Sequence, residues 1–137
     1  MIETVRLSEK ARNQLISLKR KTGLENWNSL CRWAFCLSLA EISVPPSEEI
    51  PSDSSVEMSW KVFTGGHEQL YWGLLLLRAS RDRVPVEREA LLKYFRLHLH
   101  RGISYLNGST TLRTIGDLAQ LALEHYGCDA KATAAGL

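Results

Sequence analysis

The hydrophobic positions at the start of the chain predict a short strand followed by two helices. Residues 3–7 alternate between two faces, which is the period of a strand. Apolar residues then recur at helical spacing over 9–22, which predicts a helix. Ser8 precedes this helix as a candidate N-cap, and Gly23 follows it as a residue that commonly ends a helix. A second helix is predicted from 26 to 41, and it is too apolar to be exposed.

The rest of the chain carries further helical patterns. Apolar residues alternate over 56–62, which is consistent with a strand or with an extended loop packed on the core. The helix predicted at 67–81 is apolar on every side, so we expect it at the centre of the fold or between subunits. Two more helices are predicted at 86–106 and 112–122. The fold class that follows is mainly α, a compact helical domain that self-associates.

The order of strand, helix, glycine turn and helix at the start resembles a ribbon-helix-helix unit. In such units two chains pair their strands, and outward side chains such as Thr4 and Arg6 face the DNA major groove. A short strand that packs on its own helices gives the same pattern. Both interpretations of this N-terminal unit stay open at the level of sequence.

Length and composition indicate one soluble domain. The chain has 137 residues, of which 45% are hydrophobic and 23% are charged, as is ordinary for a globular protein. We expect one helical domain over 1–127, with 43–55 as an irregular, acidic, proline-rich loop and 128–137 as a frayed tail. The apolar stretches are too short to cross a bilayer. Three cysteines without a secretory segment favour reduced thiols in the cytoplasm.

The net charge of +2 conceals a separation of charges along the chain. Residues 1–32 contain seven basic groups and three acidic ones, and 78–101 contain the same numbers, so each block carries +4. Residues 41–57 contain five acids and no base. A local positive face attracts a polyanion even when the net charge is small. A basic block of this size is nevertheless more often simply solvated surface.

The sequence contains no recognisable active site. The pair Gly65 and Gly66 is not followed by the Lys and Ser or Thr of a phosphate-binding loop. The four histidines lack neighbours at the spacing of metal ligands, and Cys31 and Cys36 lie in apolar surroundings that do not activate a thiol. We therefore expect no enzyme activity, no metal and no cofactor. The tryptophans lie in apolar windows, where core packing is more typical than base stacking: Trp27, Trp33, Trp60 and Trp72.

Three segments of the chain resemble the DndE family. They are RLSEKARNQLISLKRKTGLENWNSLCRWAFCLSLAE at 6–41, VEMSWKVFTGG at 56–66 and FRLHLHRGISYL at 95–106. The resemblance is specific, because NWNSLCRWAFCLSL and FRLHLHRG are not generic helix sequences, and it covers about residues 3–124. DndE is the small subunit of the bacterial Dnd system, which replaces a non-bridging phosphate oxygen of DNA with sulfur.

This resemblance implies a helical DNA-binding accessory subunit that self-associates, with a tetramer expected, and that prefers nicked duplex DNA. It also implies that the protein acts together with a cysteine desulfurase, an iron-sulfur ATP-pyrophosphatase-like subunit and an ATPase. The family subunit is not known as the sulfur-transferring enzyme, so no catalytic residue is carried over. Charge placement in this sequence puts the expected DNA surface at Lys10, Arg12, Lys19, Arg20 and Lys21.

Two other hypotheses stay open. A ribbon-helix-helix transcriptional regulator would bind one operator sequence through Thr4 or Arg6. A pure assembly subunit would hold partner proteins with the acidic segment 41–57 and the apolar helix 67–81, and would have weak DNA affinity of its own.

Overall fold

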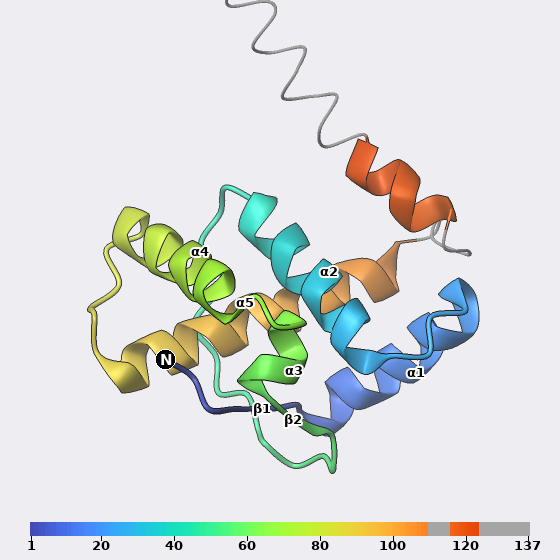
Figure 1. The fold of residues 1–137 in the computed structure, drawn as a ribbon, viewed down its shortest axis with the longest axis horizontal. Coiled ribbons are helices and arrows are strands. Elements are labelled where there is room, and N and C mark those ends of the chain that lie inside the picture. Colours follow the sequence, from blue (N-terminus) through green and yellow to red (C-terminus); the bar gives the residue numbers. More distant parts are fainter. Residues whose placement is uncertain (110–115, 124–137) are drawn as a thin grey trace, which may run out of the picture.

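The structure is a computed structural model, and it describes residues 1–109 and 116–123. It is mainly helical, as predicted, with a small two-stranded sheet near the N-terminus (Figure 1). The predicted tail at 128–137 and Cys128 lie outside the described residues. The elements within 1–109 are β1 (Thr4–Arg6), α1 (Glu9–Thr22), α2 (Trp27–Ala40), β2 (Glu57–Ser59), α3 (Trp60–Thr64), α4 (Glu68–Arg81) and α5 (Arg88–Gly108). Residues 116–123, which overlap the helix expected at 112–122, are also helical (Figure 1).

The predicted strand–helix–helix unit is present, and its strand pairs within its own chain. β1 runs antiparallel to β2, with Val5 opposite Met58 and Arg6 opposite Glu57. The alternating segment at 56–62 is therefore a strand only in its first part. From Trp60 onward it forms α3, because Ser59 caps a helix there by accepting a hydrogen bond from the Val62 amide at 3.2 Å.

α1 begins and ends where its capping residues predict. The Ser8 hydroxyl accepts a hydrogen bond from the Ala11 amide at 3.1 Å. At the other end Gly23 adopts the left-handed conformation, with φ of 74°, and its amide donates to the Lys19 carbonyl. These two caps satisfy backbone groups that a helix otherwise leaves unpaired at its ends.

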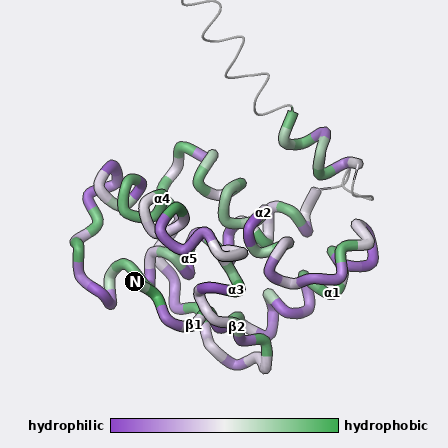
Figure 2. The backbone as a smooth tube through the Cα atoms, viewed as in Figure 1, coloured by the Kyte–Doolittle hydropathy of each residue, from purple (hydrophilic) through white to green (hydrophobic). Residues whose placement is uncertain are grey.

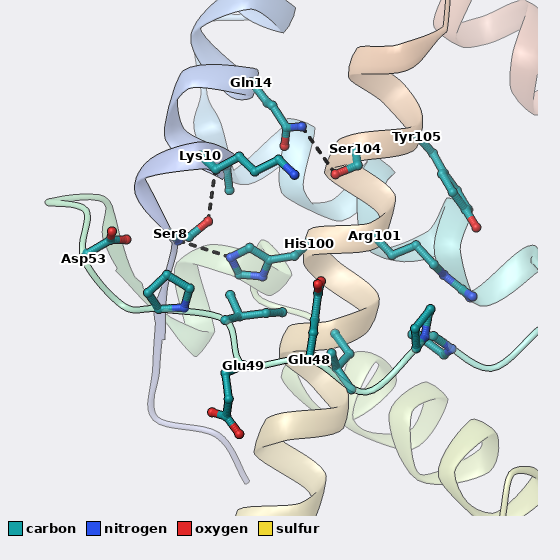
Figure 3. Close-up of a pocket in the computed structure, with 16 residues that line it drawn as sticks. Ser8, Lys10, Gln14, Glu48, Glu49, Asp53, His100, Arg101, Ser104 and Tyr105 are labelled. Atoms are coloured by element: carbon teal, nitrogen blue, oxygen red, sulfur yellow. Dashed lines mark hydrogen bonds between the residues drawn. The ribbon is translucent and has the colours of Figure 1, made fainter.

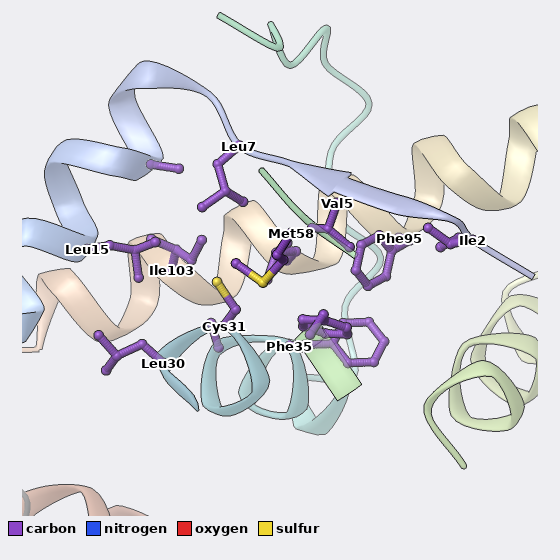
Figure 4. Close-up of a cluster of buried hydrophobic side chains, with 14 of the residues drawn as sticks. Ile2, Val5, Leu7, Leu15, Leu30, Cys31, Phe35, Met58, Phe95 and Ile103 are labelled. Carbon is purple, nitrogen blue, oxygen red and sulfur yellow. The ribbon is translucent and has the colours of Figure 1, made fainter. Parts of the chain in front are cut away.

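The core is formed where α2 crosses α5, below β1 and α1 (Figure 4). Gly102 makes this crossing possible, because a Cβ at that position would overlap the backbone carbonyl of Ala34. Beside the crossing, Phe63 packs edge to face on Phe35 and Phe95, and the rings of Phe35 and Phe95 are tilted to each other, with ring centroids 5.2 to 5.8 Å apart. Trp60 is buried against the same rings.

The segment between α2 and β2 is irregular, as predicted, and hydrogen bonds hold it against the helices. Arg96 donates to the carbonyls of Ile50 and Pro51, and Arg101 donates to the carbonyl of Ser43 at 2.8 Å. On the far side of the segment, the Asp53 carboxylate accepts from the Glu9 amide at 2.8 Å. Part of the basic block at 78–101 therefore binds the chain itself and is not an open positive face.

α4 lies at the surface and is not surrounded by the fold. Its buried side consists of Leu75, Arg78 and Ala79, whereas Leu70 and Leu77 are 58% and 72% exposed. Part of the apolar surface of α4 therefore remains exposed in a single chain. No helix among the described residues is long and apolar enough to span a membrane.

Replacing Gly102 by alanine should destabilise the protein by about 3 kcal/mol or more, because the added methyl group has no space at the α2–α5 crossing. Urea unfolding measures this. Gly108→Ala is the matched control on the same helix, since a Cβ at Gly108 meets nothing within 4 Å. Equal unfolding free energies for the two variants would contradict the close contact.

Candidate nucleic-acid interface

The last turn of α1 carries three consecutive basic residues, Lys19, Arg20 and Lys21. Arg20 is exposed, and the other two are partly exposed. α1 is largely hydrophilic along its length (Figure 2), and its C-terminal end lies at the opposite end of the molecule from α4 (Figure 1). We call these three residues the basic end of α1. Their charges also favour the helix, because cations near a C-terminus interact well with the helix dipole.

Two of these side chains are oriented by contacts within the chain. The Lys19 ammonium lies 4.8 Å from the centre of the Trp27 ring, and the Lys21 ammonium donates to the carbonyl of Asn107 at 3.4 Å. Both contacts involve partly exposed groups, so the charges stay accessible to solvent. The basic end therefore offers three cations on one short stretch of helix.

The structure does not bring all five predicted residues into one patch. Lys10 and Arg12 belong to the first turn of α1, and nine residues of helix, roughly 13 Å, separate Lys10 from Lys19. Arg12 forms an ion pair with Glu9 at 3.1 Å. Lys10 lies instead on the side of α1 that faces α5 (Figure 3).

Between α1 and α5 the surface is hollowed into a cavity of about 500 Å³, which we call the α1–α5 groove (Figure 3). Its floor is α5, and its remaining wall is the irregular segment. The polar side chains that line it come from all three parts of the chain: Ser8, Lys10, Gln14, Glu48, Glu49, Asp53, His100, Arg101, Ser104 and Tyr105. Of these, only Lys10 belongs to the predicted site. The groove has no local sequence signal, because it forms where a distant segment returns to the helices.

One histidine at the groove has a structural role. The Nε2 atom of His100 accepts a hydrogen bond from the Ser8 amide at 3.2 Å, and its Nδ1 atom donates to the Arg96 carbonyl at 2.8 Å. Burial lowers the pKa of His100 to about 4, with the charge of Arg96 acting in the same direction. The ring is therefore neutral near pH 7 and ties α1 to α5.

Behind the groove, a buried polar cluster joins α2, α4 and α5. Arg78 pairs with Asp82 at 2.8 Å, and Tyr94 donates a hydrogen bond to the same carboxylate. His98 shares a 2.8 Å hydrogen bond with Ser38, whose hydroxyl also accepts from Arg101. Burial lowers the pKa of His98 to about 4, and the nearby charges of Arg101 and Arg78 act in the same direction. Each cation here is engaged by the protein, so this cluster is architectural.

The described residues show no arrangement typical of a catalytic centre. No group of three His, Cys, Asp or Glu residues within them could hold a metal ion. Burial raises the pKa of the Cys31 thiol to about 12 and also raises the pKa of Cys36, which disfavours a nucleophilic thiolate. The tryptophans pack on the core as predicted: Trp60 is buried, and Trp27, Trp33 and Trp72 are partly buried against it.

The chain is similar to a known protein family and to solved structures of DndE proteins. The family model described as DNA sulphur modification protein DndE matches residues 4–114. The crystal structure of DndE from Escherichia coli B7A, involved in DNA phosphorothioation modification, has a TM-score of 0.65 and 25% identity, and the match covers 77% of this chain and 98% of that one. A DndE variant with glycine-to-lysine substitutions has a TM-score of 0.62 and 21% identity, over 80% of this chain and 100% of that one. No curated protein matches the chain.

The two buried histidines predict that the protein loses stability as the pH falls from 7 to 5. The ordinary histidine pKa is 6.5, so below it the unfolded chain binds protons that the native state excludes until about pH 4. Each ring should therefore lower the free energy of unfolding by about 2 kcal/mol between pH 7 and pH 5.

Urea unfolding at the two pH values measures this loss. His100→Gln removes one of the two titrating rings, so the difference between pH 7 and pH 5 should shrink to about half. An unfolding free energy that is unchanged or higher at pH 5 would show that these rings accept protons in the folded protein.

Proposed function

Because the chain belongs to the DndE family of DNA sulphur modification proteins, we propose that it is the non-catalytic DNA-binding subunit of a phosphorothioation system and favours nicked duplex DNA. The single observation that carries this proposal is the basic end of α1, where Lys19, Arg20 and Lys21 lie together at one end of the molecule. Three adjacent cations suit a polyanion, and all three are at least partly exposed.

Binding would rest on backbone phosphates. Lys and Arg side chains that neutralise phosphates release condensed counterions, so this mode depends strongly on salt and little on sequence. A nick would help because the duplex bends at low cost where one strand is interrupted. The three side chains differ in how firmly they are held. Lys19 lies over the Trp27 ring and Lys21 donates to the Asn107 carbonyl, whereas Arg20 is exposed. Two of the three charges are therefore held in place by the fold, and the third is free to adjust to the duplex.

A non-catalytic role is supported by the thiols and the histidines. Sulfur transfer through this chain would need an accessible thiolate. Cys31 is buried, and desolvation raises the pKa both of Cys31 and of the exposed Cys36. His98 and His100 are buried and hydrogen-bonded, so neither is placed to move a proton to or from a substrate. The chemistry would then belong to partners in the cytoplasm: a cysteine desulfurase, an iron-sulfur ATP-pyrophosphatase-like subunit and an ATPase.

Self-association, as a tetramer, is the second part of the proposal. Leu70 and Leu77 on α4 are largely exposed and lie two turns apart on one side of the helix. Ile42, whose carbonyl accepts a hydrogen bond from Arg78 of α4 at 3.0 Å, is 77% exposed. Exposed apolar residues that gather on one face are typical of a protein–protein contact. A second copy on this face would leave the basic end of α1 free, since it lies at the other end of the molecule.

Operator recognition through the strand is less well supported. Arg6 forms an ion pair with Glu57 at 2.8 Å, and its strand already pairs with β2 along one edge. We therefore place the DNA-binding function on α1 and not on β1.

Replacing Lys19, Arg20 and Lys21 together by glutamine should weaken binding to intact and nicked duplex alike. The slope of log Kd against log salt should fall by about one for each phosphate that the variant no longer neutralises. Fluorescence anisotropy at several salt concentrations measures both quantities.

The control variant removes three positive charges from other parts of the surface. Lys61, Arg81 and Arg88 are exposed and lie on α3, α4 and the start of α5. Their triple glutamine variant should keep most of the affinity and the salt slope. If the two triple variants lose the same affinity, net charge accounts for the binding and the basic end of α1 is misassigned.

A single Leu77→Glu substitution should lower the molecular mass of the protein in solution, because it places a charge in the proposed α4 contact. Light scattering measures the mass. Val86→Glu is the matched control, since Val86 is 79% exposed and lies outside α4. An unchanged mass for Leu77→Glu would place self-association on another surface.

A further inference from the structure

The α1–α5 groove combines chemical groups that suit a nucleobase better than a phosphate. Its volume of about 500 Å³ falls in the range of roughly 300 to 1,000 Å³ that is usual for small-ligand sites. Three carboxylates line it, those of Glu48, Glu49 and Asp53. They would repel a phosphate group, whereas a carboxylate can accept a hydrogen bond from the amino group of a base.

An exposed aromatic ring of α5 lines this groove. Tyr105 is 43% exposed although it lies on α5, whose other aromatic residues, Tyr94 and Phe95, are buried. The Arg101 guanidinium lies 5.6 Å from the centre of the Tyr105 ring, and it is held by hydrogen bonds to the carbonyls of Ser38 and Ser43, each at 2.8 Å. An aromatic ring steadied by a fixed guanidinium is a suitable platform for a stacked base.

Side chains from α1, α5 and the irregular segment supply hydrogen-bonding groups to the groove. Gln14 of α1 donates to the Ser104 hydroxyl of α5 at 3.3 Å, so an amide and a hydroxyl meet across the groove. Lys10 extends from α1 toward α5, and the Glu48 side chain points from the irregular segment toward α5 (Figure 3). A base carries both donors and acceptors along its edge, and these four side chains offer both.

The groove also has the right separation from the basic end of α1. Gln14 and Lys21 are seven residues apart on α1, roughly 10 Å along its axis. One strand of DNA advances about 3.4 Å per nucleotide. A strand whose phosphates contact the basic end could therefore place a base about three nucleotides away at the groove.

We propose that the α1–α5 groove binds one unpaired nucleobase at the strand end of a nicked duplex, stacked on Tyr105, with Glu48 and Gln14 at its edge. This inference rests on the proposed DNA-binding function and adds a second, base-binding contact to it. The basic end of α1 then supplies affinity for any duplex, and the groove supplies the preference for interrupted strands.

The test compares nicked duplexes that carry a one-nucleotide flap at the nick, with the flap base either present or replaced by an abasic site. The full-length protein should bind the flap with a base at least about fivefold more tightly, as the value of one stacked base suggests. This difference should vanish in Tyr105→Ser and persist in Tyr105→Phe. Val86→Ser, at an exposed apolar position outside α4, is the control and should retain it.

Two further measurements separate this inference from the proposed function. A 2-aminopurine flap should lose fluorescence on binding to the wild-type protein and not on binding to Tyr105→Ser. Intact duplex should bind both proteins equally. If flaps with and without a base bind equally while intact duplex is bound, the groove does not take a base, although the DNA-binding function stands. If none of these DNAs is bound even at low salt, both conclusions are overturned.

Discussion

The contact between Gly102 of α5 and the backbone of Ala34 sets the distance between α2 and α5, the two helices that form the centre of the core. Because no side chain stands between the helices at this point, their flanking residues interdigitate, and the phenylalanine cluster closes beside them. The crossing also fixes where α5 presents its other faces. On one face of α5, His100 and Ser104 form hydrogen bonds with Ser8 and Gln14 at α1. Another face carries the polar cluster around His98. The groove and the orientation of α1 both follow from this single close approach.

The distribution of positive charge follows from the same packing. Three arginines form hydrogen bonds within the chain and are not available to a ligand. The guanidinium groups of Arg78, Arg96 and Arg101 donate to carbonyls of the irregular segment. This segment has no regular secondary structure to satisfy its own backbone, so arginines with several donors stabilise it. The cations left for a polyanion are therefore fewer than the sequence contains. Lys19, Arg20 and Lys21 stay together at the basic end of α1.

The sequence predicted the elements whose signals are local. Ser8 and Gly23 gave the limits of α1, and the helix expected at 86–106 is observed as α5 over Arg88–Gly108. α3 was missed, because five residues are too short for helical periodicity and the alternation at 56–62 favoured a strand. The pairing of β1 with β2 joins residues more than 50 positions apart, and hydrophobic spacing carries no information on such a partner.

The proposed site was predictable only in part, for related reasons. Charge placement predicted a DNA surface at the basic end of α1, since Lys19, Arg20 and Lys21 are consecutive. It also grouped Lys10 and Arg12 with them, although helix length places these residues nearer the other end of α1. Tyr105 and Glu48 gave no signal, because their proximity depends on the path of the irregular segment across α5. Membership in the DndE family supplied the DNA context that composition alone left open.

The central claim is that DNA contacts α1 at its basic end, and lysine acetylation with and without nicked duplex tests it most directly. Mass spectrometry would follow the modification of each lysine at limiting reagent. The account predicts that DNA protects Lys19 and Lys21, while Lys61 of α3 and Lys93 of α5 are modified as before. Protection of Lys61 and Lys93, with Lys19 and Lys21 still modified, would place the DNA on another face of the molecule and contradict the account.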